Sequence, residues 1–201
     1  MRMDRRSDSG FTLVELFAVI ALMACGTAMA VMLTHGASKL GKADSGAKLV
    51  ASVLRKARES AIAKRRNMKV VFNLTANTMQ IVRVEYNWSV TPITAVDNVE
   101  QTVPLEGGVQ FLKYGAITAY PISTFPTSTA AVTFTQVSSA PTVLFTPEGF
   151  ALDPVTNNPM DGTIFLGRPN EQDTARALTM TGVTALVERW TYRQTAWVSA
   201  R

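Results

Sequence analysis

The chain has little of the side-chain chemistry on which most enzyme active sites depend. It contains one histidine, His35, and one cysteine, Cys25, and residues 36–201 contain neither. A Ser-His-Asp triad and a multi-histidine metal site both need histidine in the folded domain. A disulfide within the chain needs a second cysteine. We therefore expect no catalytic residue, no metal site, no cofactor and no small-molecule substrate.

Charged residues are also scarce, and their signs are unevenly distributed. They make up 17% of the 201 residues, whereas about 25% is usual in soluble proteins. Residues 35–70 contain ten Lys and Arg against two acidic residues, and residues 71–201 contain seven against ten. A nucleic-acid interface needs clustered basic residues to neutralise phosphates. Because the larger C-terminal part is mildly acidic, we expect no nucleic-acid partner.

Residues 11–34 lack charge almost completely, since Glu15 is their only charged residue. As a helix these residues would extend about 36 Å, enough to cross a hydrocarbon core of about 30 Å. The arginines in residues 1–10 favour a cytoplasmic N-terminus. A secretory signal peptide is the alternative, but its apolar core is usually only about 7–15 residues long. We therefore predict a single transmembrane segment at 11–34.

The helical pattern continues beyond this segment, and no proline interrupts it before Ile62. Apolar residues recur at spacings of three and four, which is the pattern of one buried helix face. They are Leu40, Ala43, Ala47, Val50, Leu54, Ala57 and Ala61. We predict an amphipathic helix to about Arg66. Whether Gly36, Gly41 and Gly46 bend it stays open.

Short β-rich runs separated by turn residues follow Arg66, with no further helical periodicity. This texture is typical of an antiparallel sheet. The runs are 68–73, 80–86, 109–112, 132–135, 142–146, 163–166, 177–180 and 185–190. The sequence therefore predicts an α+β fold in which a long N-terminal helix packs its apolar stripe on an antiparallel β head.

The carboxylate of Glu15 needs an explanation, because a charge at helix depth in lipid costs about 2.5–3.5 kcal/mol. A cut between Gly10 and Phe11 would place a new α-amine about one helical turn from Glu15. In a staggered array of such helices, the amine of one subunit would meet the carboxylate of the next. The segment Gly10-Phe11-Thr12-Leu13-Val14-Glu15-Leu16 resembles the class III signal of type IV pilins and type II secretion pseudopilins.

This resemblance implies partners and processing. A prepilin peptidase would cleave after Gly10 and methylate the α-amine of Phe11, and Glu15 would guide assembly with other pilin-like subunits. It implies a protein of the bacterial inner membrane whose C-terminal head is periplasmic. The predicted parts are a leader at 1–10, a transmembrane half-helix at 11–34, an amphipathic half-helix at 35–66 and a β-rich head at 67–201.

Two further segments narrow the resemblance to the GspH/FimT group of minor pilins and pseudopilins. Phe145-Thr146-Pro147-Glu148-Gly149 matches that group's F-x-P-x-G turn, and Gly182 matches the glycine of its closing hairpin. DNA-binding members have a basic Gly-Arg-type motif there, whereas Val183 follows Gly182. The expected function is a structural minor pseudopilin of type II secretion. The alternatives are a type IV minor pilin for adhesion, motility or DNA uptake, a major pilin, or a membrane-anchored enzyme.

Other polar clusters have an ordinary structural interpretation beside a functional one. The loop 153–161 contains Asp153, Asn157, Asn158 and Asp161, whose oxygens suit Ca²⁺ but are also common in turns. Lys64, Arg65, Arg66 and Lys69 can contact phosphate, or can form a solvated helix end. Glu148 with Asp153 and Asp161 offers carboxylates for hydrolysis without any further catalytic element. Trp88, Trp190 and Trp197 suit a binding face or ordinary packing.

Overall fold

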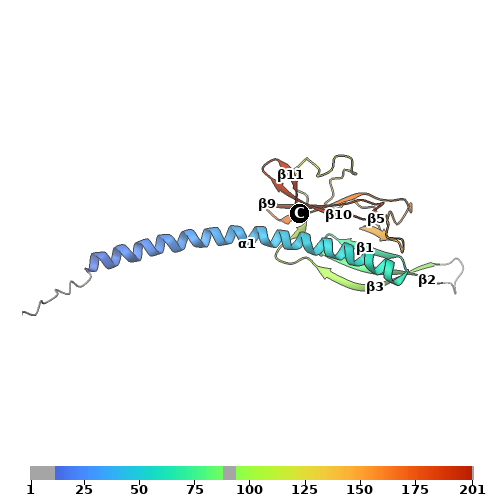
Figure 1. The fold of residues 1–201 in the computed structure, drawn as a ribbon, viewed down its shortest axis with the longest axis horizontal. Coiled ribbons are helices and arrows are strands. Elements are labelled where there is room, and N and C mark those ends of the chain that lie inside the picture. Colours follow the sequence, from blue (N-terminus) through green and yellow to red (C-terminus); the bar gives the residue numbers. More distant parts are fainter. Residues whose placement is uncertain (1–11, 88–93, 201) are drawn as a thin grey trace, which may run out of the picture. The chain divides into compact units, whose positions relative to one another are not determined.

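A computed structural model describes residues 12–87 and 94–200, and the side chains of residues 29–37, 86, 87 and 94 are not described. The described residues form one helix and eleven strands (Figure 1). The chain divides into two compact units, residues 1–39 and residues 40–201. The elements are α1 (Leu13–Lys64), β1 (Met68–Asn73), β2 (Thr78–Asn87), β3 (Thr94–Pro104), β4 (Gln110–Phe111), β5 (Gln136–Val137), β6 (Ala140–Phe145), β7 (Ala151–Leu152), β8 (Gly162–Arg168), β9 (Glu171–Met180), β10 (Val187–Arg193) and β11 (Ala196–Ser199).

The helix α1 is continuous through Gly36, Gly41 and Gly46. It ends at Lys64, two residues before the predicted end, in a Schellman motif. The Arg66 N–H donates to the Ala61 carbonyl at 3.2 Å, and Arg65 takes the left-handed conformation with φ 51°. Glycine usually occupies this position. Because an arginine holds it here, the sequence contains no glycine to mark the end of the helix.

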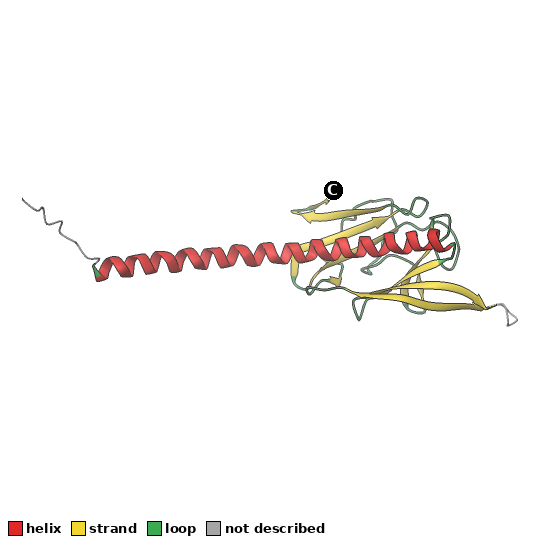
Figure 2. Ribbon diagram, turned by 60° about the horizontal axis from the view of Figure 1, so that its bottom comes forward, coloured by secondary structure: helices red, strands yellow, loops and turns green. Residues whose placement is uncertain are grey.

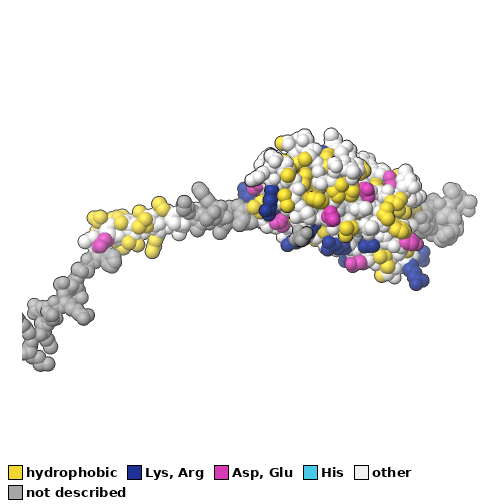
Figure 3. All heavy atoms as spheres, turned by 45° about the horizontal axis from the view of Figure 1, so that its top comes forward, with side chains coloured by type: hydrophobic (Ala, Val, Ile, Leu, Met, Phe, Trp, Pro, Cys, Tyr) yellow, Lys and Arg dark blue, Asp and Glu magenta, His cyan; other side chains and the backbone are white. Residues whose placement is uncertain are grey.

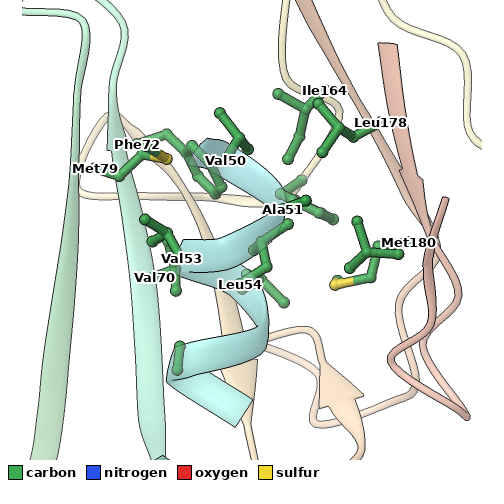
Figure 4. Close-up of a cluster of buried hydrophobic side chains, with 14 of the residues drawn as sticks. Val50, Ala51, Val53, Leu54, Val70, Phe72, Met79, Ile164, Leu178 and Met180 are labelled. Atoms are coloured by element: carbon green, nitrogen blue, oxygen red, sulfur yellow. The ribbon is translucent and has the colours of Figure 1, made fainter. Parts of the chain in front are cut away.

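Two antiparallel sheets enclose the second half of α1. One has the strand order β3-β2-β1-β6-β5, with β7 beside β6, and the other has the order β11-β10-β9-β8-β4. Figure 4 shows Val53 facing Val70 on one side and Leu54 lying towards Met180 on the other. All four of these side chains are buried. The core therefore lies on both sides of one helix, and Figure 2 shows the C-terminal half of the helix running along the two groups of strands.

The predicted apolar stripe is confirmed except at its first residue. Six of its seven residues are buried, whereas Leu40 is 38% exposed. Ala51 and Val53 are buried as well, although they lie beside the stripe. The buried arc is wider than predicted because the helix packs against two sheets and not against one. The predicted α+β architecture of a long helix on an antiparallel head is confirmed.

The strand predictions are correct where the sequence is apolar. The run 68–73 is β1, and the other predicted runs overlap strands except 132–135. That run makes an isolated bridge between Val132 and Ile164, and the Phe134 ring lies over Gly162. The predictions missed β3, a long edge strand that includes Asp97 and Glu100. They also missed the short strands β5, β7 and β11.

Candidate functional site

The predicted processing residues Gly10 and Phe11 lie outside the described residues, but Glu15 is described and exposed. Its Oε2 accepts hydrogen bonds from the Thr12 N–H and from the Thr12 hydroxyl, both at 3.1 Å. In return, the Glu15 N–H donates to the Thr12 hydroxyl oxygen at 3.3 Å. This reciprocal arrangement is a capping box, which satisfies N–H groups left without partners at the start of a helix.

The capping box gives Glu15 a local structural role beside its predicted role in assembly. The signal was present as Thr12-Leu13-Val14-Glu15, the Thr-x-x-Glu pattern of such caps. No hydrogen bond to Oε1 of Glu15 is found in residues 12–87 or 94–200. The box therefore fixes the position of the carboxylate and leaves one oxygen for a further cationic partner.

Beyond this cap, the first turns of α1 present large apolar side chains on all sides. Figure 3 shows that most side chains in this part of the helix are apolar. The exposed ones are Leu13, Val14, Leu16, Phe17, Val19, Ile20, Leu22 and Met23. Among the residues that the structure describes, no helix is both long enough and apolar enough to cross a membrane. The transmembrane role of 11–34 therefore stays a prediction from the sequence.

Acidic residues of β3 lie against the basic cluster at the end of α1. The ammonium of Lys64 contacts Glu100 at 2.5 Å, and that of Lys69 contacts Asp97 at 2.5 Å. Ile81 pairs with Gln101 while Val82 pairs with Val99, so Glu100 is the extra residue of a β-bulge. A bulge changes the direction of a side chain, and here it coincides with the contact to Lys64. Two of the four basic residues are thus engaged within the chain, which favours the structural interpretation of the cluster.

The F-x-P-x-G segment forms a tight turn that α1 holds in place. The Gly149 N–H donates to the Thr146 carbonyl at 2.9 Å, and Gly149 has φ 89°, a region that suits glycine. Nε of Arg58, from the helix, donates to the Gly149 carbonyl at 3.0 Å. The turn is therefore fixed to the helix, and the exposed side chain of Phe150 follows it directly.

Gly182 lies at the start of the β9–β10 connection and is packed against the loop 153–161. Its N–H donates to Oδ1 of Asp161, and its carbonyl accepts from the Ala151 N–H, both at 2.8 Å. A Cβ at this position would lie 2.3 Å from the backbone nitrogen of Met160. The glycine of the closing hairpin therefore meets the chain at Ala151, two residues after the F-x-P-x-G turn ends at Gly149. Glycine is required at 182 because two backbones approach each other closely.

The acidic residues of the loop 153–161 bond to the chain itself. Asp153 accepts from the Thr135 hydroxyl at 2.6 Å, from the Val155 N–H at 2.7 Å and from the Thr156 N–H at 3.3 Å. Asp161 caps Gly182, as above. Among the described residues, no group of three or more His, Cys, Asp and Glu side chains is placed to hold a metal ion. These contacts give both carboxylates a structural role.

The hydrogen bonds of Asp153 make the stability of the head depend on pH. Burial raises the pKa of Asp153, but the bonds from Thr135, Val155 and Thr156 outweigh it, so the pKa lies below its ordinary value of 3.8. A lowered pKa in the folded state stabilises the fold above the ordinary pKa, and this contribution is lost as the pH falls through the lowered value.

We expect the melting temperature of the full-length protein in detergent to fall more steeply below about pH 4 than that of Asp153→Asn, because the variant has no charge to lose there. Melting curves at steps from pH 7 to pH 2 measure this. Glu148→Gln, a change at an exposed carboxylate, is the matched control and should follow the wild type. Parallel curves for the wild type and Asp153→Asn would contradict the expectation.

The contacts of the two described tryptophans favour ordinary packing over a binding face. Nε1 of Trp190 donates to the Thr179 hydroxyl at 2.9 Å, and Nε1 of Trp197 donates to the Ala119 carbonyl at 2.9 Å. The Trp197 ring also lies 5.8 Å from that of Phe165. The third tryptophan, Trp88, lies outside the described residues. Trp190 and Trp197 therefore tie strands and a loop together.

Two solved structures of low sequence identity match most of this chain. The minor pseudopilin EpsH from the Type 2 Secretion System of Vibrio cholerae is 11% identical, with a TM-score of 0.45, over 75% of this chain and 97% of EpsH. The type IV minor pilin FimU of Pseudomonas aeruginosa is 14% identical, with a TM-score of 0.45, over 79% of this chain and 93% of FimU. A search of curated proteins gives no significant match.

The family assignment rests on a family model. The model described as type II transport protein GspH matches residues 46–184, more than two thirds of the chain. This match confirms the predicted resemblance to the GspH/FimT group and the prediction of a type II secretion pseudopilin. Such a protein is a structural subunit of the cell envelope that assembles with other pilin-like subunits. The chain belongs to the GspH family of type II transport proteins.

Proposed function

We propose that this chain is a minor subunit of a type II secretion pseudopilus that assembles through its N-terminal helix. A prepilin peptidase cleaves it between Gly10 and Phe11 and methylates the new α-amine of Phe11. The segment 11–34 anchors it in the bacterial inner membrane, with the N-terminus cytoplasmic and the head, 67–201, periplasmic. The observation that carries the proposal is the carboxylate of Glu15 at the start of an exposed apolar helix.

Glu15 supplies the driving force for specific assembly. In lipid an unpaired carboxylate costs about 2.5–3.5 kcal/mol, and the capping box with Thr12 offsets only part of this cost. An α-amine at Phe11 of a neighbouring subunit removes the rest by pairing with the free Oε1. A wrong axial offset between two helices leaves the carboxylate unpaired. The ion pair therefore sets the stagger between subunits, while the exposed apolar side chains supply the contact area.

The head supports a packing role better than a nucleic-acid or enzymatic role. Lys64 and Lys69 contact acidic residues of β3, so fewer cations are available for phosphates than the sequence suggests. Residues 36–201 have no histidine or cysteine. A type IV minor pilin remains the second candidate function, since it would use the same helix. We favour the secretion pseudopilus because the matched family is a type II transport family.

Cross-linking of the full-length protein in its native membranes tests this proposal. Mass spectrometry of the enriched protein should identify secretion-type pseudopilins among the linked partners and peptides that begin at methylated Phe11. Partners from a type IV pilus would instead assign the second function. An N-terminus still at Met1, together with no pilin-like partner, would reduce 11–34 to a simple anchor and defeat the proposal.

A further inference from the structure

The head contains a groove that neither the fold nor the assembly helix explains. It lies between the beginning of the head part of α1 and the strands β9 and β10, and its volume is about 610 Å³. This is within the range of small-molecule sites, about 300–1,000 Å³. The residues that matter to its chemistry are Leu40, Asp44, Asp173, Arg176, Tyr192 and Arg193.

Arg176 forms a buried wall of this groove, and one nitrogen of its guanidinium group has no partner among the described residues. The residue is only 4% exposed. Its Nε donates to Oδ1 of Asp44 at 2.5 Å, and its Nη1 donates to the carbonyls of Asp173 at 3.2 Å and Ala175 at 3.0 Å. Nη2 has no hydrogen-bond partner among the described residues, yet it is not one of their fully buried unsatisfied atoms. Nη2 therefore opens onto the groove, where it can donate to an anionic oxygen.

The rim of the groove adds both signs of charge. Arg193 is exposed and provides a second guanidinium, and Asp173 is an exposed carboxylate. The side chain of Asp44 is 49% exposed, so its second oxygen is accessible. Leu40 and Tyr192 add apolar surface. The groove thus complements a ligand that contains an anion and a cation within a few ångströms of each other, next to an apolar part.

The length of the chain keeps this groove close to the predicted membrane segment. Leu40 follows Thr34, the last residue of that segment, by six residues. Six residues span at most about 21 Å even when fully extended. Leu40, a lining residue of the groove, is therefore within about 21 Å of the end of the predicted membrane segment. Tyrosine, present here as Tyr192, is also enriched at membrane interfaces.

We propose that the groove binds the zwitterionic phosphodiester headgroup of a membrane phospholipid, of the phosphoethanolamine type. Nη2 of Arg176 and the Arg193 guanidinium donate to the phosphate oxygens. The ammonium group pairs with Asp173 and with the free oxygen of Asp44. This inference rests on the membrane placement in the proposed function. An acidic segment of a neighbouring subunit fits less well, because it satisfies the guanidinium groups but leaves the two carboxylates without a partner.

The test uses the full-length protein in detergent and soluble glycerophosphoethanolamine as the probe. This probe has no acyl chains, so the exposed apolar helix does not contribute to binding. Isothermal titration should show saturable binding that Arg193→Gln weakens about ten-fold. Arg55→Gln, which removes an equivalent exposed charge from α1 outside the groove, should leave it unchanged. Asp173→Asn should weaken glycerophosphoethanolamine but not glycerophosphoglycerol, which has no ammonium group.

Four results would overturn the inference. They are no saturable binding of either diester, wild-type affinity in Arg193→Gln, equally tight binding of inorganic phosphate, and binding of a capped acidic peptide while both diesters stay silent. The last of these would assign the groove to a protein partner. The titration does not depend on filament assembly. Failure of headgroup binding and failure of the proposed function can therefore be distinguished.

Discussion

Glu15→Ala is expected to lower the amount of the protein incorporated into filaments about ten-fold or more, with no loss from the membrane. A hydrogen bond to a charged group contributes about 1.5–3 kcal/mol, and about 1.4 kcal/mol corresponds to a factor of ten. Loss of the pair with a neighbouring α-amine therefore affects assembly strongly. Membrane insertion is not impaired, because alanine removes a charge that costs about 2.5–3.5 kcal/mol in lipid. Quantitative cross-linking to other pseudopilins and membrane fractionation measure the two effects.

The capping box provides the control that separates the two roles of Glu15. A glutamine also completes a capping box, so Glu15→Gln keeps the helix start but removes the charge. If the ion pair guides assembly, Glu15→Gln fails as Glu15→Ala does. If only the cap matters, Glu15→Gln assembles normally and the proposed role of the carboxylate is wrong. Glu59→Ala, at an exposed position of the same helix, should behave as the wild type.

The sequence predicts the part of the fold that depends on local periodicity. The stripe on α1 and the strand β1 each bury one face, so their apolar residues recur with the period of the element. The edge strand β3 has no such signal, because Asp97 and Glu100 pair with the basic residues Lys69 and Lys64 instead of facing a core. Charged edge strands resist unwanted pairing. The charged residues that protect β3 as an edge strand also remove the apolar pattern by which a strand is recognised in a sequence.

The candidate functional residues also fall into those that the sequence identifies and those that only the fold brings together. Gly10, Phe11 and Glu15 are adjacent in a short motif, so sequence alone identifies them, although the structure tests none of their roles. The groove is different, because Asp44 and Arg176 are 132 residues apart and meet only in the folded head. Such pairs leave no periodic pattern, and only the fold brings them together.

Gly182→Ala is expected to destabilise the head strongly. The added Cβ would lie 2.3 Å from the Met160 nitrogen and 2.8 Å from the Pro159 carbonyl carbon. These are backbone atoms, so no side chain can rotate away, and the hairpin must separate from the loop. Overpacking costs typically about 1–3 kcal/mol, and for a chain of this length each kcal/mol lowers the melting temperature by about 2–4 °C. We therefore expect a fall of about 2–12 °C, measured by circular dichroism on the full-length protein.

The matched control is Gly115→Ala, since a Cβ at Gly115 meets no atom within 4 Å. This variant should melt about 1–4 °C above the wild type, because an alanine without contacts or left-handed backbone stabilises by about 0.4–1 kcal/mol. Equal melting temperatures for Gly182→Ala and the wild type would mean that the hairpin and the loop separate without cost. In that case Gly182 would not be required for packing. If Gly182→Ala is destabilised but still reaches filaments, the closing hairpin serves the stability of the head and the assembly contacts lie elsewhere, as the exposed helix around Glu15 already suggests.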